Sequence, residues 1–220
     1  MTERGMIFNA EMVRAILDGR KTQTRRIMKE QPVLNGNFYE VFGSAWSKGM
    51  TSIPAVPGHS LSTRCPFGAV GDRIWVRETF CPVDDTQYGG EKWVDYRATP
   101  RYEASHPAGW DSAPNDAEAL KWRPSIHMPR WASRILLEIT DARVERLNAI
   151  SEEDATAEGV PPAGSLLPDY PGTFLTPKGD FATAKVAFQR LWESIYGEES
   201  WNANPWVWVI SFKRVEGGAA

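Results

Sequence analysis

"GRKTQTRR", Gly19 to Arg26, places four cations and two threonines within eight residues. The stretch follows a short apolar run, MVRAIL, in which the apolar residues recur at helical spacing. Asn9 is a residue type that often caps the start of a helix, and Gly19 stands where a glycine often ends one. The sequence therefore predicts a short helix over residues 10–18 and a basic loop directly after it.

So much positive charge in one loop contrasts with the rest of the chain. The 220 residues hold 25 Lys and Arg against 28 Asp and Glu, a formal net charge of −3. This balance argues against a protein that coats nucleic acid and leaves room only for a local basic site. Cations near a helix C-terminus gain about 0.3–1 kcal/mol each, which accounts for one or two of the four. Donors to a nucleotide phosphate or a polar base account for all four and for the hydroxyls, so we interpret the loop as a binding site.

Short periodic segments mark the remaining predicted elements. GDRIWVRETF, residues 71–80, predicts a strand with Ile74 and Val76 on its apolar face. RILLEIT, residues 134–140, predicts a half-buried strand, which we expect to be followed by a turn and a second short strand through Val144. Also predicted are a strand in KWVDYRA (92–98), a capped helix over 151–158 before Gly159, an amphipathic helix over 184–195, and a closing strand over 206–215.

Three segments lack periodicity and are rich in residues that break helices and strands: 29–69, 81–130 and 160–180. We interpret them as long loop insertions in a strand-dominated core, hence an α+β fold with a small barrel or curled sheet. No apolar stretch is long enough to span a bilayer and no signal sequence is evident, so we expect a cytosolic protein. Cys65 and Cys81 form no CxxC pair and the histidines lack metal-ligand spacing, so we expect free thiols and no metal.

The basic loop also carries a family resemblance. ILDGRKTQTRR resembles the GxKxxTxR signature that opens ASCH domains, which are relatives of the PUA-like RNA-binding barrels. GDRIWVRETF, ISEEDATAEGV and WVWVISF follow in the order that this family requires, and the arrangement with insertions is similar to ASCH proteins carried by tailed phages and prophages. The resemblance implies one domain over residues 1–220, a PUA-like β-barrel flanked by short helices, with the three insertions at its rim.

The resemblance implies three functional hypotheses. One bacterial ASCH protein is an amidohydrolase that removes the acyl group from the exocyclic amine of acetylcytidine, using a lysine, a threonine and a glutamate. These residues match Lys21, Thr24 and Glu158, so the first hypothesis is an amidohydrolase that acts on an acylated cytidine-type nucleoside or nucleotide. The second is a non-catalytic module that binds RNA, DNA or a modified nucleotide. The third is a ribonuclease, which would have to work without a histidine near the motif. We expect no cofactor and no membrane partner, favour a monomer, and place a phage-encoded member in the host cytoplasm.

Three catalytic residues must converge for the first hypothesis. Lys21 and Thr24 would point to opposite faces of an extended strand, so the segment must turn after Gly19. Lys21, partly desolvated among arginines, would have a lowered pKa and act as the base. Glu158 would hand a proton to the leaving amine; its carboxylate in the last turn of a helix costs about 0.3–1 kcal/mol, which Lys21 would offset.

The other candidate residues are assigned to substrate binding. Glu78 falls on the apolar face of its strand, either as a buried carboxylate paired with an arginine or as a pocket wall. Trp93, Tyr96 and Trp110 are possible stacking platforms for bases, although core packing is the more common role of such residues. The substrate-binding set is Arg20, Thr22, Arg25, Arg26, Arg77 and Glu78.

Overall fold

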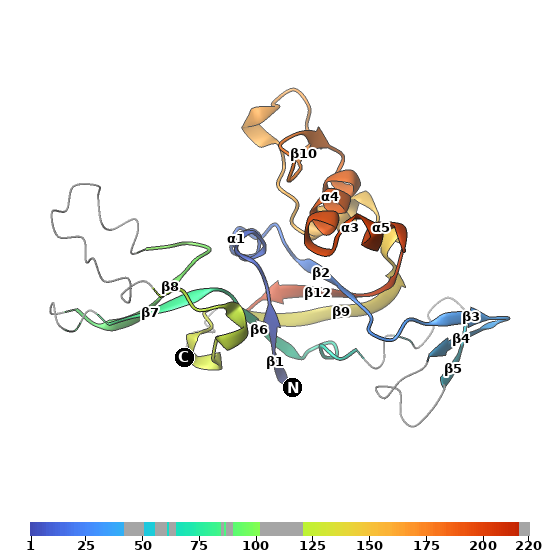
Figure 1. Cartoon of the computed structure of the whole chain (residues 1–220), viewed down its shortest axis with the longest axis horizontal. Coiled ribbons are helices and arrows are strands. Elements are labelled where there is room, and N and C mark those ends of the chain that lie inside the picture. The colour runs from blue at the N-terminus through green and yellow to red at the C-terminus, as the bar shows by residue number, and fades with distance from the viewer. Residues whose placement is uncertain are drawn as a thin grey trace.

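A five-stranded sheet forms the centre of the molecule in a computed structural model (Figure 1). Its strand order is β1-β6-β9-β12-β2, with β1 and β6 parallel and every other neighbouring pair antiparallel. The strands are β1 (Glu3–Ile7), β6 (Arg73–Arg77), β9 (Leu136–Arg146), β12 (Trp206–Arg214) and β2 (Gln23–Ile27). The structure describes residues 1–41, 51–55, 61, 65–84, 86, 90–101 and 121–215.

The α+β class predicted from the sequence is confirmed, but the described residues form an open sheet rather than a closed barrel. β1 and β2 are the two edges of the sheet, and within the described residues they do not pair with each other. The edges approach each other through side chains instead. Arg26 of β2 donates from Nη2 to the Ile7 carbonyl at 2.6 Å, and its guanidinium lies 5.3 Å from the centre of the Phe8 ring.

Apolar side chains cover both faces of the sheet. Along β12, Trp208 and Ile210 join a cluster that includes α1 (Ala10–Leu17), whereas Val207 and Val209 join a cluster on the other face. All four side chains are buried. This explains why WVWVI is continuously apolar, because a strand that is covered on both faces has no solvent side. The second cluster is supplied by α3 (Glu152–Ala157), α4 (Ala184–Tyr196) and α5 (Glu198–Asn202).

The predicted pair of strands around residue 140 is in fact one strand, β9, of 11 residues. Its partner β12 shifts register there, since Ile139 pairs with Phe212 but Asp141 pairs with Ser211. Thr140 is therefore the extra residue of a β-bulge, which changes the parity of the buried positions. The expected turn was wrong because this change of parity looks like a break in the sequence.

The predicted helices are confirmed, together with their caps. Asn9 Oδ1 accepts a hydrogen bond from the Met12 amide at 2.8 Å, and Gly19 follows α1 with φ +75°. Ser151 Oγ accepts from the Asp154 amide at 3.1 Å at the start of α3. α4 lies where the amphipathic pattern placed it.

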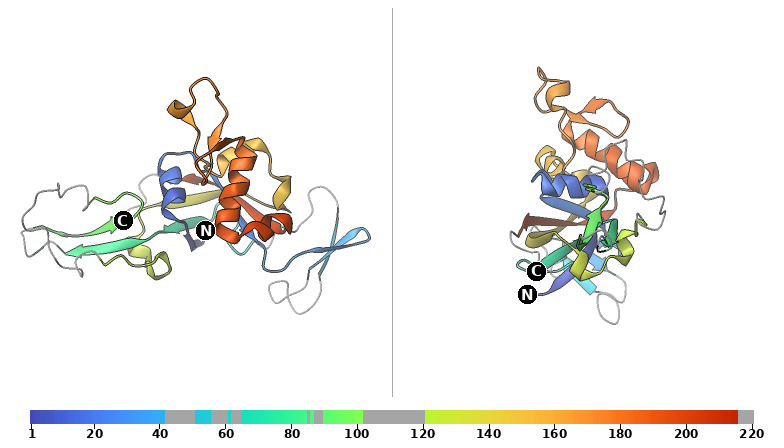
Figure 2. Two further views of the ribbon diagram at one scale, coloured as in Figure 1. Left: turned by 45° about the horizontal axis from the view of Figure 1, so that its top comes forward. Right: turned by 90° about the vertical axis from the view of Figure 1, so that its left-hand side faces the viewer.

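Apart from the strand predicted in KWVDYRA, the three insertions contain short strands where loops were expected. Runs of two to five residues are too short to show a clear period in the sequence. The sheets β3-β4-β5 and β7-β8 reach out on opposite sides of the central sheet, and β10-β11 stands over α4 (Figures 1 and 2). The predicted strand in KWVDYRA is β8. The bounds are β3 (Val33–Asn35), β4 (Phe38–Val41), β5 (Thr51–Pro54), β7 (Phe80–Asp84), β8 (Lys92–Tyr96), β10 (Phe174–Leu175) and β11 (Phe181–Ala182), with 3₁₀ turns at Ser125–His127, Arg130–Ala132, Leu147–Ala149 and Gly164–Leu166.

Helices of membrane-spanning length and apolarity are absent from the part of the chain that the structure describes.

Candidate functional site

The basic loop turns as expected and is held between the ends of two helices. The Lys21 amide donates to the Ala15 carbonyl of α1, and the Thr22 amide donates to the Ala157 carbonyl of α3, both at 2.9 Å. Gly159 makes this close approach possible. Its φ is +86°, and a Cβ there would lie 2.7 Å from the Lys21 Cβ. The side chain of Lys21 is thereby directed to the C-terminus of α3.

Lys21 and Glu158 form a buried ion pair. Lys21 Nζ donates to Glu158 Oε2 at 2.8 Å and to the Glu158 backbone carbonyl, also at 2.8 Å. The side chains are 1% and 4% exposed. Burial lowers the pKa of Lys21 from its ordinary value, against the opposing effect of the Glu158 charge. The cation that was expected to offset a carboxylate at a helix C-terminus is therefore present, and it is held away from water.

Arg25 holds the other oxygen of the same carboxylate. Its Nη1 donates to Glu158 Oε1 at 3.1 Å, while Nη2 donates to Asp154 at 2.9 Å and to Glu145. Its side chain is fully buried, and its guanidinium lies 5.9 Å from the centre of the Phe188 ring. With three carboxylates as partners, Arg25 does not fit the substrate-binding role that the sequence suggested, and it instead fixes the position of Glu158.

Thr24 lies on the opposite side of β2 from Arg25, because side chains alternate along a strand. A small pocket is nevertheless lined by three consecutive residues, Thr24, Arg25 and Arg26, together with Glu158. Consecutive residues can line one pocket only where it runs along the open edge of the strand. Since β2 is an edge strand of the sheet, its free side provides this opening. Thr24 and Glu158 are therefore brought to one pocket.

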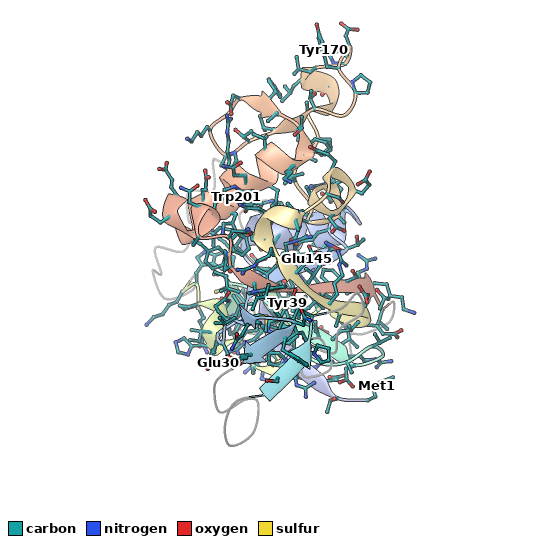
Figure 3. The ribbon with its side chains drawn as sticks, turned by 90° about the vertical axis from the view of Figure 1, so that its right-hand side faces the viewer. Met1, Glu30, Tyr39, Glu145, Tyr170 and Trp201 are labelled. Atoms are coloured by element: carbon teal, nitrogen blue, oxygen red, sulfur yellow. The ribbon has the colours of Figure 1, made fainter. Side chains whose placement is uncertain are left out.

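A larger pocket of about 530 Å³ lies on the other side of Glu158. This volume is in the range of small-molecule sites. One wall comes from α1 and the basic loop, and the other comes from the 160–180 insertion and α4. Figure 3 shows how far this insertion stands above the sheet, with Tyr170 at its tip and Glu145 below α3. The lining residues are Asn9, Glu11, Met12, Arg14, Asp18, Arg20, Glu158, Gly159, Val160, Pro161, Leu175, Thr176, Pro177, Gly179, Ala187 and Leu191.

The other cations of the basic loop occupy different positions. Arg20 lines the larger pocket, where it donates to the Gly159 carbonyl at 2.9 Å and pairs with Asp18 at 3.0 Å. Arg26 lines the small pocket. Thr22 is exposed, and it lines neither of these two pockets. Of the predicted binding residues in the loop, Arg20 and Arg26 are thus placed to meet a ligand.

Glu78 and Arg77 line neither of the two pockets that Glu158 shares. Both Glu78 oxygens accept from the Arg134 guanidinium at 3.0 Å, so the first of the two alternatives, a buried carboxylate paired with an arginine, is the correct one. Burial raises the pKa of Glu78, with Arg134 opposing the change. Arg77 donates to the carbonyls of Ser125 and Ile126. The structure therefore gives this pair of residues local partners away from Lys21.

The candidate stacking aromatics already have arginine partners. The Arg101 guanidinium lies 5.5 Å from the centre of the Trp93 ring, and that of Arg134 lies 3.9 Å from the centre of the Tyr96 ring. Trp110 lies outside the described residues.

Sequence reasoning missed several residues that shape the site. Asp154 and Glu145 both accept hydrogen bonds from Arg25, and neither is among the site residues predicted from the sequence. Leu191 belongs to the amphipathic helix predicted over 184–195, and it lines both pockets. The alternation of charges around Val144 in β9 was an available signal for Glu145, whereas nothing local marked Leu191 as a pocket residue.

Within the described part of the chain, no group of three or more His, Cys, Asp or Glu side chains is arranged so that it could hold a metal ion. Cys65 and Cys81 are not joined in a disulfide. No family model, curated protein or solved structure matches the chain.

Proposed function

We propose that this protein is an amidohydrolase of the cytoplasm that removes an acyl group from the exocyclic amine of a modified cytidine-type nucleoside or nucleotide. The observation that carries the proposal is the buried 2.8 Å contact between Lys21 and Glu158, where Glu158 also lines a pocket with Thr24. Lys21 itself lines neither of the two pockets and is joined to this one through Glu158. A base, a hydroxyl and a carboxylate are groups that amide hydrolysis uses. The resemblance to the ASCH family supports the proposal at the same three residues. We also propose that the central sheet corresponds to a PUA-like barrel opened between β1 and β2.

Lys21 is the proposed base. Burial favours its neutral amine, which has a lone pair available for a proton. This amine accepts the proton of the Thr24 hydroxyl, or of a water held by that hydroxyl, while the oxygen attacks the acyl carbonyl carbon. If Thr24 itself attacks, a water later cleaves the acyl-threonine ester. In both routes one water is consumed, the C–N bond breaks, and a carboxylic acid and the free amine are released.

Lys21 also fits the role of proton donor to the leaving amine. Both Glu158 oxygens accept hydrogen bonds, Oε2 from Lys21 and Oε1 from Arg25, so this carboxyl group is an acceptor in the observed arrangement. Lys21, once protonated, would pass its proton to the exocyclic nitrogen as the C–N bond breaks. Glu158 then orients Lys21 and stabilises the ammonium form. This division of roles replaces the earlier expectation that Glu158 delivers the proton.

Arg26 is the proposed donor to the developing oxyanion. It lies on the same side of β2 as Thr24 and lines the same pocket. Its Nε is buried and has no hydrogen-bond partner within the described residues. A donor that is already in place when charge develops lowers the barrier, and losing one typically costs about 10²–10³ in kcat.

The test is incubation of the full chain with a panel of acylated cytidines, followed by chromatography. Lys21→Ala should lower kcat by about 10²–10⁴, as expected for loss of a general base. Lys213→Ala is the matched control, because Lys213 is an exposed lysine whose 2.9 Å ion pair is with Glu138 in the neighbouring strand. Near wild-type turnover by Lys21→Ala on a genuine substrate would show that the mechanism is wrong.

A non-catalytic module that binds RNA, DNA or a modified nucleotide is the second candidate. The observation in its favour is that Lys21 Nζ already makes two hydrogen bonds and is almost fully shielded. The larger pocket, with Arg14 and Arg20 opposite an apolar wall, would then bind the nucleotide. Saturable binding of acylated cytidine without turnover would favour this alternative. The ribonuclease hypothesis requires that the protein cleaves unmodified RNA and that Lys21→Ala abolishes this cleavage.

A further inference from the structure

Glu158 stands between two pockets of very different size. The larger one encloses about 530 Å³ and the smaller one about 20 Å³. Three residues line both pockets: Met12 from α1, Glu158 after α3, and Leu191 from α4. These residues therefore form the boundary between the two spaces.

The small pocket has an apolar wall that is fixed in place by α4. Phe188 and Trp192 contribute to it, with ring centres 6.0 Å apart, and Trp192 Nε1 donates to Ser200 Oγ at 2.9 Å. Tyr196 packs on Trp192 at 4.5 Å between ring centres. One water-sized group needs roughly 10–15 Å³ of such volume. The pocket therefore has room for a group of about the size of a methyl. Its wall has little freedom to retreat at Phe188 and Trp192, which are buried, whereas Ile195 and Tyr196 complete the lining from exposed positions.

A reacting amide must be placed across the boundary. Its carbonyl carbon carries the acyl chain on one side and the nitrogen on the other, and Thr24 and Glu158 both line the small pocket. The nucleoside is far too large for a space of about 20 Å³, so it must occupy the larger pocket. The acyl chain then points into the small pocket, toward α4.

We propose that Leu191 is a specificity-determining residue that limits the substrate to short acyl groups, with acetyl preferred over propionyl and longer chains. This inference rests on the amidohydrolase function proposed above. The half-buried Leu191 side chain closes the small pocket on the side of the larger one. An extra methylene that has no space must displace packed side chains, which discriminates by an amount comparable to about 10–200-fold per methylene in apolar pockets.

The experiment compares kcat/KM for acetyl-, propionyl- and butyryl-cytidine with the full chain. The wild type should lose about 10-fold or more with each added methylene. Leu191→Ala should raise the propionyl-to-acetyl ratio of kcat/KM by about 10-fold or more, because truncation opens the boundary. Leu175→Ala is the matched control, since Leu175 is also a half-buried leucine but lines only the larger pocket. It should change all three substrates by a common factor and leave the ratio as in the wild type.

The outcomes separate this inference from the function on which it rests. Turnover with a flat dependence on chain length, or a ratio that Leu191→Ala leaves unchanged, would refute the role of Leu191 while the amidohydrolase function stands. Absence of turnover for all three substrates would refute both. If Leu191→Ala fails to fold, Ile195→Ala is a second test, because Ile195 is exposed and its truncation should leave the fold intact. Ile195 lines only the small pocket, so Ile195→Ala should also raise the propionyl-to-acetyl ratio of kcat/KM.

Discussion

Replacing Glu158 by glutamine tests whether the buried ion pair is formed as described. The substitution keeps the shape of the side chain but removes the charge that faces Lys21 and Arg25. Arg25 retains Asp154 and Glu145 as partners, whereas the other acceptor within reach of Lys21 Nζ is the backbone carbonyl of residue 158. Breaking a buried pair by removing one partner costs about 3–5 kcal/mol. We expect a loss of unfolding free energy of this size near neutral pH, with the variant less stable but still folded.

The loss should depend on pH in a defined direction. Burial already holds the pKa of Lys21 below its ordinary 10.5, and removal of the carboxylate should lower it further. A group with a lowered pKa in the folded state binds fewer protons there than in the unfolded chain. Stability therefore rises with pH between the folded pKa and 10.5. The pH range between the folded-state pKa of Lys21 and 10.5 is wider in Glu158→Gln than in the wild type. The loss of unfolding free energy in the variant, relative to the wild type, should therefore shrink as the pH rises from neutral toward 10.5.

Guanidinium denaturation at neutral and alkaline pH measures both effects. Glu138→Gln is the matched control, because its 2.9 Å pair with Lys213 is at the surface. Such pairs contribute at most about 1 kcal/mol. If Glu158→Gln costs no more than this control, or if its deficit does not change with pH, Lys21 is not a buried cation held by Glu158.

Three further predictions concern the same region. Gly159→Ala should reduce both thermal stability and turnover, because φ is +86° and the added Cβ would lie 2.7 Å from Lys21 Cβ. Gly179→Ala is its control, since φ is +82° but nothing lies within 4 Å of the added Cβ. This control should lose only the backbone strain of about 1–2 kcal/mol. The pH profile of kcat/KM should rise to a plateau with a midpoint below 10.5, since the neutral amine of Lys21 is the active form; a profile that falls over this range would argue against Lys21 as the base. Glu78→Gln should lower the unfolding free energy and leave KM unchanged, because its carboxylate is used by Arg134; a raised KM in a stably folded variant would return Glu78 to the substrate site.

The sequence by itself determined the features that depend on neighbouring residues. α1 begins after Asn9 and ends before Gly19, and α3 begins after Ser151 and ends before Gly159. Each cap is made with residues no more than four positions away in the sequence. The basic loop had to turn if Lys21 and Thr24 were to meet over one cleft. It does turn, but Thr24 lines the small pocket whereas Lys21 lines neither of the two pockets that Glu158 shares. These features were predictable because a cap or a turn is a local interaction that the unfolded chain already holds within reach.

Only the tertiary structure decided which distant groups share the site. Arg25 and Glu158 are 133 positions apart in the chain, and nothing near Arg25 marks it as a holder of carboxylates rather than a ligand-binding cation. The bulge at Thr140 depends on the register of β12, and the small pocket exists because β2 is an edge strand beside α4. Contacts of this kind form when separate elements pack. Their geometry follows from strand order, register and crossing, which a pattern of adjacent residues does not contain.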